Sequence, residues 1–213
     1  MANWVNVQLD VRGLPIDVEH FRRAAGAKVG RINTARSKVF TLAMEHGEAA
    51  DLEADPIERF GDRFRTASYR FQGRYDDHVD HFQKVSRRFP KLAFVLAYSD
   101  PNCDDHGSYL LLRGTRRTWV VPYVMRVHIL RKALVRYGLP ADLDTSSAEG
   151  DEVFWAENEA YWEMQELAAR RWEKVVMQWL KNGSVVPAGR KPRPTARDAR
   201  GRRRSTSRSA KRS

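Results

Sequence analysis

The sequence has a single cysteine and no long hydrophobic run. Because Cys103 is the only cysteine among the 213 residues, an intrachain disulfide is excluded. The longest apolar stretches, 92–98 and 119–125, fall far short of the roughly 20 residues that a membrane-spanning helix needs. The first residues also lack the basic and apolar segments of a secretory signal peptide. We therefore expect a cytoplasmic protein that does not cross a membrane.

Motifs that define an enzyme are missing too. There is no P-loop, no glycine fingerprint for a dinucleotide and no pair of closely spaced cysteines. His78 and His81 lie three residues apart near a predicted helix start, and Cys103 and His106 follow in a loop that could approach them. The alternative is an ordinary helix start in which the acidic residues suit the helix dipole and the histidines face water. We expect no catalytic residue, metal or cofactor, with a metal-dependent enzyme using His78, His81 and His106 as the weaker alternative.

Acidic residues are nearly absent from the last 31 residues, where Asp198 stands alone against 11 Lys and Arg. The whole chain has 38 Lys and Arg and 27 Asp and Glu, a net charge of +11, so residues 183–213 carry +10 and the remainder +1. This segment has no aromatic residue and cannot bury enough surface to offset the entropy of ordering. We expect a disordered basic tail that neutralises the phosphates of DNA or RNA without reading sequence. Its cations are Arg190, Lys191, Arg193, Arg197, Arg200, Arg202, Arg203, Arg204, Arg208, Lys211 and Arg212.

Other roles for this tail stay open. It could be a solubilising end without a dedicated partner, a nuclear-import signal or a segment for anionic lipid. Lipid is the weaker of these because the tail has no apolar face to insert.

Alternating apolar residues open the chain. Val5, Val7 and Leu9 alternate with polar residues, which predicts a half-buried strand over 5–11. Asp17 can then cap a helix over 18–25. We expect further strands at 38–44, 66–71, 91–98, 108–113 and 118–121, and a helix at 76–88. This order predicts an α+β fold, specifically a ferredoxin-like split βαβ domain with an extra hairpin strand.

Beyond Pro122 the pattern changes to helices. One is predicted over 123–137, and a second over 148–181 because Ser146 and Glu149 form a capping box. We therefore expect a ferredoxin-like α+β domain over 1–122, a helical extension with one long helix over 123–182, and a disordered Arg-rich tail over 183–213.

The long helix carries four of the six tryptophans. Trp155 and Trp162 are seven residues apart, as are Trp172 and Trp179. This stripe could pack on the sheet or on the preceding helix. Alternatively, a helix that overhangs a small domain could use it to bind a second copy of the chain or another protein, where tryptophan is common at hot spots.

A basic cluster on the preceding helix, Arg126, Arg131 and Lys132 with Arg136, offers phosphate contacts in addition to the tail. A solvated helix face, neutralised by acids of the long helix, is the equal alternative.

The first strand also has the outline of an RNA-recognition motif. Those domains stack bases on aromatic residues of the sheet face, whereas Gln8 and Asp10 project outward here, and an acid repels phosphate. Tyr69 and Phe71 lie on a later strand without the required glycine spacing. We expect core and rim residues of a sheet at these positions.

Two blocks of the sequence resemble a known family. Met1 to Trp4 with the strand that follows, then Asp17-Val18, Phe21 and Ala24-Ala25, look like the opening of the YubB-type ferredoxin-like proteins of plasmids, genomic islands and phages. Residues 67–114 resemble the C-terminal half of that family, although the family's Trp and paired prolines are replaced by Phe71-Gln72-Gly73-Arg74. The resemblance implies a fold and a mobile-element origin, and it transfers no site.

These patterns lead to one main hypothesis and one alternative. The main hypothesis is a non-enzymatic accessory protein of a mobile genetic element that binds nucleic acid through its basic tail. The alternative is a protein-interaction module, for example an inhibitor of a host defence or regulatory complex, that acts through the Trp-rich helix.

Overall fold

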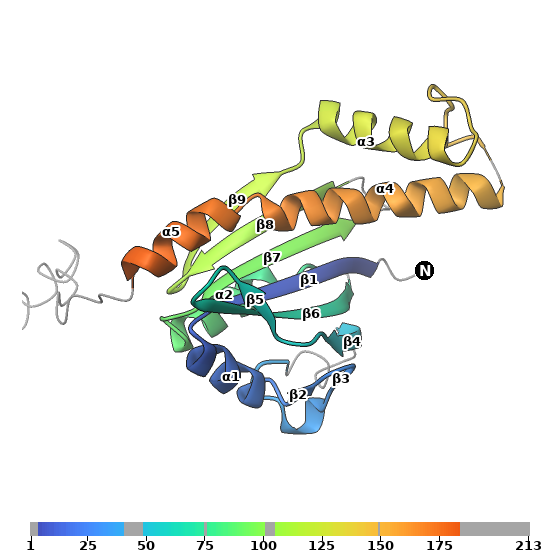
Figure 1. Cartoon of the computed structure of the whole chain (residues 1–213). Coiled ribbons are helices and arrows are strands. Elements are labelled where there is room, and N and C mark those ends of the chain that lie inside the picture. Colours follow the sequence, from blue (N-terminus) through green and yellow to red (C-terminus); the bar gives the residue numbers. More distant parts are fainter. Residues whose placement is uncertain (1–3, 41–48, 75, 101–104, 149, 184–213) are drawn as a thin grey trace, which may run out of the picture. The chain divides into compact units, whose positions relative to one another are not determined.

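The structure, a computed structural model, describes residues 4–40, 49–74, 76–100, 105–148 and 150–183 (Figure 1). It has the mixed α+β composition that the sequence predicts, with one main antiparallel sheet of order β4-β6-β1-β7-β8-β9 and with β5 paired to β6. The elements are β1 (Trp4–Gly13), α1 (Pro15–Ala24), β2 (Ala27–Lys28), β3 (Arg31–Ile32), η1 (Thr34–Arg36), β4 (Ala49–Ala54), β5 (Glu58–Phe60), β6 (Phe64–Arg74), α2 (Val79–Arg88), β7 (Ala93–Asp100), β8 (Asp105–Leu112), β9 (Thr115–Val120), α3 (Tyr123–Arg136), α4 (Asp151–Arg170) and α5 (Glu173–Gly183).

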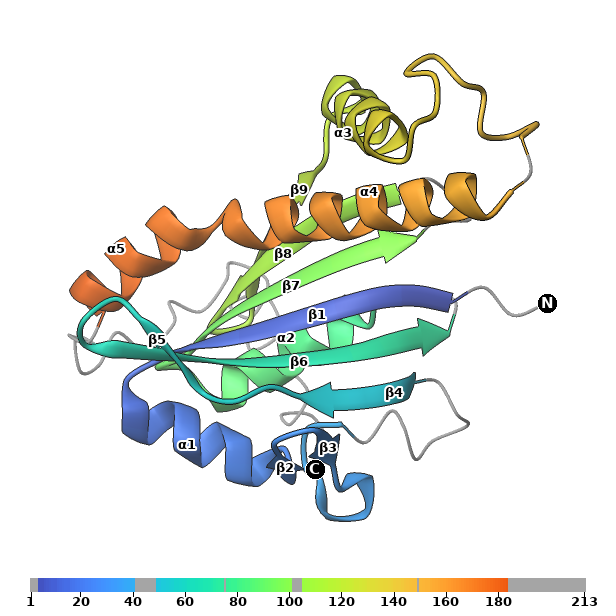
Figure 2. The same ribbon diagram turned by 45° about the vertical axis from the view of Figure 1, so that its right-hand side comes forward.

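The alternation of β1 decides which face of the sheet is the main core. Val5, Val7, Leu9 and Val11 are buried with residues of α1 and α2, which cover this face. Phe21 of α1 contributes to the same cluster, with its ring edge-on to that of Tyr69. The polar residues between these apolar ones point to the opposite face, where α4 and α5 lie (Figure 2).

Each helical connection skips one strand of the sheet. The chain leaves β1 through α1 and reaches β4, with β6 between the two strands. It leaves β6 through α2 and reaches β7, with β1 between them. Because β1 and β4 each pair antiparallel with β6, they run in the same direction. Strands β8 and β9 then extend the sheet beyond β7.

The second strand differs from the prediction. No strand forms over the described residues Lys38 to Phe40, and the rest of the expected strand, residues 41–44, lies outside the described part of the chain. Val39 and Phe40 are buried instead, and the Ser37 hydroxyl accepts hydrogen bonds from their two backbone amides. The edge strand is β4, whose Ala-rich sequence gives little β signal and which is specified by pairing with β6.

The second face of the sheet is covered by the C-terminal helices. Gln165 of α4 is buried, and its amide donates hydrogen bonds to the backbone oxygens of Asn6 and Ala97. Helix α3 packs on α4 through Ile129, Ala133 and small residues of α4. Strands and helices up to Asn182 therefore form one compact unit. Among the described helices, none has the length and apolar composition needed to cross a membrane.

The predicted long helix is divided into α4 and α5. The chain turns at Arg171 and Trp172, where Trp172 is buried and its indole N–H donates to the Ser108 hydroxyl at 2.9 Å. This contact holds the junction on β8. No proline or glycine marks the division, so the sequence offers no signal for it.

The start of α4 also differs from the prediction. Glu149 of the expected capping box lies outside the described residues, and α4 begins at Asp151 without a side-chain cap. Ser146 instead donates from its backbone and hydroxyl to the Asp144 carboxylate, which lowers the pKa of Asp144. Asp144 thus holds the Ser146 N–H and O–H in a local turn that precedes α4.

Candidate functional site

A groove of about 930 Å³ lies beside α4, between α3 and residues on the sheet side of α4. It is a mixed apolar and charged surface built from three parts of the chain. Helix α3 contributes Val124, Met125, His128, Ile129 and Arg136, helix α4 contributes Glu159, Trp162, Glu163, Glu166, Leu167 and Arg170, and the sheet side contributes Gln8, Asp55 and Arg70.

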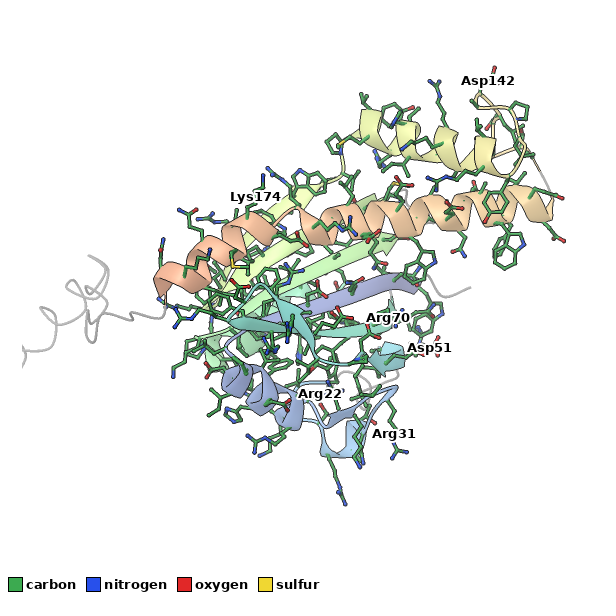
Figure 3. The ribbon with its side chains drawn as sticks, viewed as in Figure 1. Arg22, Arg31, Asp51, Arg70, Asp142 and Lys174 are labelled. Carbon is green, nitrogen blue, oxygen red and sulfur yellow. The ribbon has the colours of Figure 1, made fainter. Side chains whose placement is uncertain are left out.

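The charges of this groove are paired with one another. Arg136 of α3 pairs with Glu159 and, at 3.7 Å, with Glu163. Arg170 pairs with Glu166 one turn away. On the sheet side Arg70, which Figure 3 labels, donates to Asp55 at 2.6 Å. Paired charges leave little net field, so the groove favours a partner that offers apolar and hydrogen-bonding groups over a polyanion.

The four tryptophans of the predicted interaction stripe fall into two groups. Trp155 and Trp162 on α4 are 52% and 48% exposed. Trp172 is buried and Trp179 is half-buried, and both pack with α5 against the sheet. The split arises because the chain turns between the two pairs and brings the second pair over β7 and β8. The first pair therefore offers the larger surface to another molecule.

Further exposed apolar side chains lie at the start of α4 and at the start of α3. Phe154 is 60% exposed, and its ring lies edge-on to Trp155 with centroids 5.2 Å apart. At the start of α3, Tyr123, Val124 and Met125 are also exposed. Exposed aromatic and aliphatic residues gathered beside a groove are typical of an interaction site.

The basic cluster of α3 is partly neutralised. Arg131 and Lys132 are exposed on the helix. Arg126 is half-buried and lies over the Tyr123 ring at 5.6 Å, while Arg136 belongs to the ion pairs of the groove. Two of the predicted phosphate contacts of the folded part, Arg131 and Lys132, are therefore exposed to solvent. All the predicted contacts of the tail, from Arg190 to Arg212, lie outside the described residues.

The outward face of β1 holds a buried polar network. Asp10 accepts hydrogen bonds from Arg12 at 2.8 Å, from the Ser68 hydroxyl at 2.8 Å and from Gln8 at 3.1 Å. The Arg12 guanidinium also lies 4.5 Å from the centre of the Phe60 ring. Asp10 and Arg12 are only 4% and 5% exposed, so this network is part of the sheet's packing and does not present an RNA-binding face.

The aromatic residues considered for base stacking are also buried. Tyr69 and Phe71 point to the α1 and α2 side, where each contacts the Phe40 ring. Burial raises the pKa of Tyr69. The sequence expectation of core residues at these positions is confirmed.

The histidines considered for metal binding lie on opposite faces of the sheet. His106 is buried on the α4 side, bonded to the Ser99 hydroxyl at 2.8 Å and stacked on the Tyr161 ring. His78 and His81 belong to the α2 side, where His81 bonds the Val39 oxygen at 2.7 Å. Within the described segments no group of three or more metal-ligating side chains comes together, and Cys103 lies outside those segments.

One polar cluster was not visible in the sequence. On the α2 side, Tyr98 and Tyr109 stack with centroids 5.2 Å apart, and Tyr109 donates a hydrogen bond to Asp77. Burial raises the pKa of Asp77, and it raises that of Tyr98 to about 12. Both phenols keep their protons at neutral pH. Only the register of β7 on β8 brings the two tyrosines together, so no local motif could reveal them.

Comparison of the chain with models of protein families, with curated proteins and with solved structures finds no match.

Proposed function

We propose that this chain is a non-enzymatic accessory protein of a mobile genetic element and that it binds nucleic acid in the cytoplasm without sequence preference. The observation that carries the proposal is the segregation of charge, because residues 183–213 hold +10 of the net charge of +11. Arg131 and Lys132 on α3 add two exposed cations of the folded part. Cations that meet phosphates release condensed counterions, which gives affinity without base readout.

The test is the salt dependence of binding by the full chain. Fluorescence anisotropy with a labelled DNA duplex, and with an RNA of equal length, gives the dissociation constant over a range of KCl concentrations. We expect a tail variant with Arg202→Gln, Arg203→Gln and Arg204→Gln to lower the slope of log affinity against log salt by roughly 3. A flat salt dependence in the unmodified chain, or an unchanged slope in the tail variant, would contradict the proposal.

A matched control removes the same number of charges from the folded part. Lys28→Gln, Arg31→Gln and Arg36→Gln act on exposed residues near the β4 edge. We expect this control variant to bind with nearly unchanged affinity.

The proposed origin rests on the fold and on the resemblance to YubB-type proteins. We propose that the fold is ferredoxin-like. The strand order β4-β6-β1-β7 supports this topology, as do the two helical connections, α1 from β1 to β4 and α2 from β6 to β7. Strands β8 and β9 would then be the added hairpin. The mobile-element context follows from the resemblance alone.

A second candidate function is protein binding through the groove beside α4. It is favoured by the exposure of Trp155 and Trp162 on α4, with Trp162 lining the groove together with apolar residues of α3. An affinity pull-down compares the intact chain with a Trp155→Ala and Trp162→Ala variant, and with Ile16→Ala as a control on the exposed side of α1. Loss of a partner with the double variant alone would support this function. Retention of every partner would contradict it.

A further inference from the structure

Two basic segments that are distant in sequence meet at the β9 side of the sheet. Residues 84–91 and 113–117 contain seven Lys and Arg and no Asp or Glu. The first segment is the second half of α2 with the turn that follows, and the second is the turn from β8 into β9. We call them together the α2–β9 surface. Its cations are Lys84, Arg87, Arg88, Lys91, Arg113 and Arg116, whereas Arg117 pairs with Leu110 and shares its face of the sheet, on the side of α5.

Specific hydrogen bonds fix the two segments against each other. The Gln83 amide donates to the Gly114 oxygen at 2.7 Å, and the Gly114 amide donates to the buried Ser86 hydroxyl at 2.9 Å. Arg113 donates to the Pro90 oxygen at 3.1 Å. Gly114 has a φ of +83°, and a β-carbon there would lie 2.2 Å from Cγ of Arg87. The positions of these cations are therefore set by the fold.

These six side chains are exposed although the folded part as a whole is nearly neutral. Asp80 pairs with Arg116 at 3.0 Å at the border of the surface. The positive field also reaches a neighbouring group. Burial lowers the pKa of His81, and Lys84 and Arg88 lower it further.

Simpler roles explain single charges of this surface. Arg87 and Arg88 suit the negative end of the α2 dipole, and charges on β9 discourage pairing with another sheet edge. These roles do not require the exclusion of acids from both segments. They also do not require the turn at Gly114, where the absence of a side chain lets Arg87 pack against the start of β9.

We infer that the α2–β9 surface binds the phosphate backbone of nucleic acid, so that the folded part adds its own contacts to those of the tail. This inference rests on the proposed function. The guanidinium groups of Arg87 and Arg116 match phosphate oxygens in a forked geometry, whereas Lys84 and Lys91 act as point charges. Because β9 is the last strand on this side of the described sheet, the surface is open along its length. Such contacts position a nucleic acid without reading its bases.

The test uses the full chain with Lys84→Gln, Arg87→Gln and Lys91→Gln. All three residues are exposed, and the control is the variant Lys28→Gln, Arg31→Gln and Arg36→Gln, which loses the same charge near the opposite edge of the sheet (Figure 3). Anisotropy with the labelled duplex and RNA gives affinities, and circular dichroism melting verifies that both variants are folded. We expect roughly tenfold weaker binding and a salt slope smaller by about 2 to 3 for the α2–β9 variant alone.

The possible outcomes separate this inference from the proposed function. If the tail variant weakens binding but the α2–β9 variant matches its control, the inference is overturned and the proposed function stands. If neither nucleic acid binds to the unmodified chain, both fail. Binding to vesicles of phosphatidylserine and phosphatidylcholine that depends on Lys84, Arg87 and Lys91, without nucleic-acid binding, would overturn the inference in favour of a lipid surface.

Discussion

The indole N–H of Trp172 donates to the Ser108 hydroxyl at 2.9 Å, and the same hydroxyl donates to the Ala168 oxygen at 2.8 Å. Ser108 thus connects the end of α4, the start of α5 and strand β8 through one oxygen atom. Its Oγ is buried between apolar layers, so no solvent can replace either partner.

We expect Trp172→Ala to lower the free energy of unfolding by about 3–5 kcal/mol, because a buried indole and its hydrogen bond are lost. Ser108→Ala should lower it by about 1–2 kcal/mol by leaving the Trp172 N–H unpaired. Trp155→Ala is the control, and its effect should stay below about 1 kcal/mol since Trp155 is half-exposed. Urea denaturation measures all three. Equal effects of Trp172→Ala and Trp155→Ala would show that the α4–α5 junction is not packed on β8.

The buried pair of Asp10 and Arg12 gives a second prediction. We expect Asp10→Ala to lower the free energy of unfolding by about 3–5 kcal/mol, because the Arg12 charge stays buried without its carboxylate. The double variant Asp10→Ala, Arg12→Met should lose less than the sum of the two single variants. A double-mutant cycle by urea denaturation measures this coupling. Additive effects would mean that the two charges do not interact across the sheet face.

The pH dependence of stability tests the environment of His81. Its pKa in the folded state is lowered by burial, below the usual 6.5. The unfolded chain therefore takes up the proton first as pH falls, so the stability contributed by neutral His81 is present above pH 6.5 and is lost as pH falls through the lowered pKa. The difference in unfolding free energy between the unmodified chain and His81→Gln should change in that direction. A difference that is constant with pH would contradict the buried neutral imidazole.

Gly114 gives a prediction for the α2–β9 surface. Gly114→Ala places a side chain at a φ of +83° and against the stem of Arg87, so we expect a loss of about 1–3 kcal/mol in unfolding free energy. Gly138→Ala is the control, because it has a similar φ of +75° but no atom within 4 Å of the added carbon. Thermal or urea melts give the unfolding free energy of both variants. A larger loss for Gly114→Ala than for Gly138→Ala would measure the contact between the turn and α2. Equal losses would assign the whole effect to backbone strain.

The sequence predicts those elements whose signal is local. The alternation of Val5, Val7 and Leu9 locates β1, and the apolar spacing of 79–89 locates α2. Strand β4, by contrast, consists of residues with weak strand preference and is held by its pairing with β6. The division of α4 from α5 depends on the contact of Trp172 with Ser108, which are 64 residues apart. Contacts of this kind exist only in the folded chain.

The candidate sites, too, depend on contacts between residues that are distant in sequence. The spacing of Trp155 and Trp162 indicates a common helix face, but only the packing of α3 and α5 decides that this pair is exposed while Trp172 is buried. Likewise, the cations of 84–91 and 113–117 are visible in the sequence, but the sequence does not show that the two segments are neighbours. Their meeting depends on the hydrogen bond of Gln83 with Gly114, for which no spacing rule exists.

The central position of β1 has a consequence for synthesis at the ribosome. This strand is made before its two partners, β6 and β7, which begin only at Phe64 and Ala93. At translation rates of roughly 5–20 residues per second, an apolar strand waits for several seconds before either neighbour is available. During that time β1 is a template for another nascent chain. Slow decoding after β1 should therefore favour aggregation, and a chaperone that shields residues 4–13 should protect the yield of folded protein.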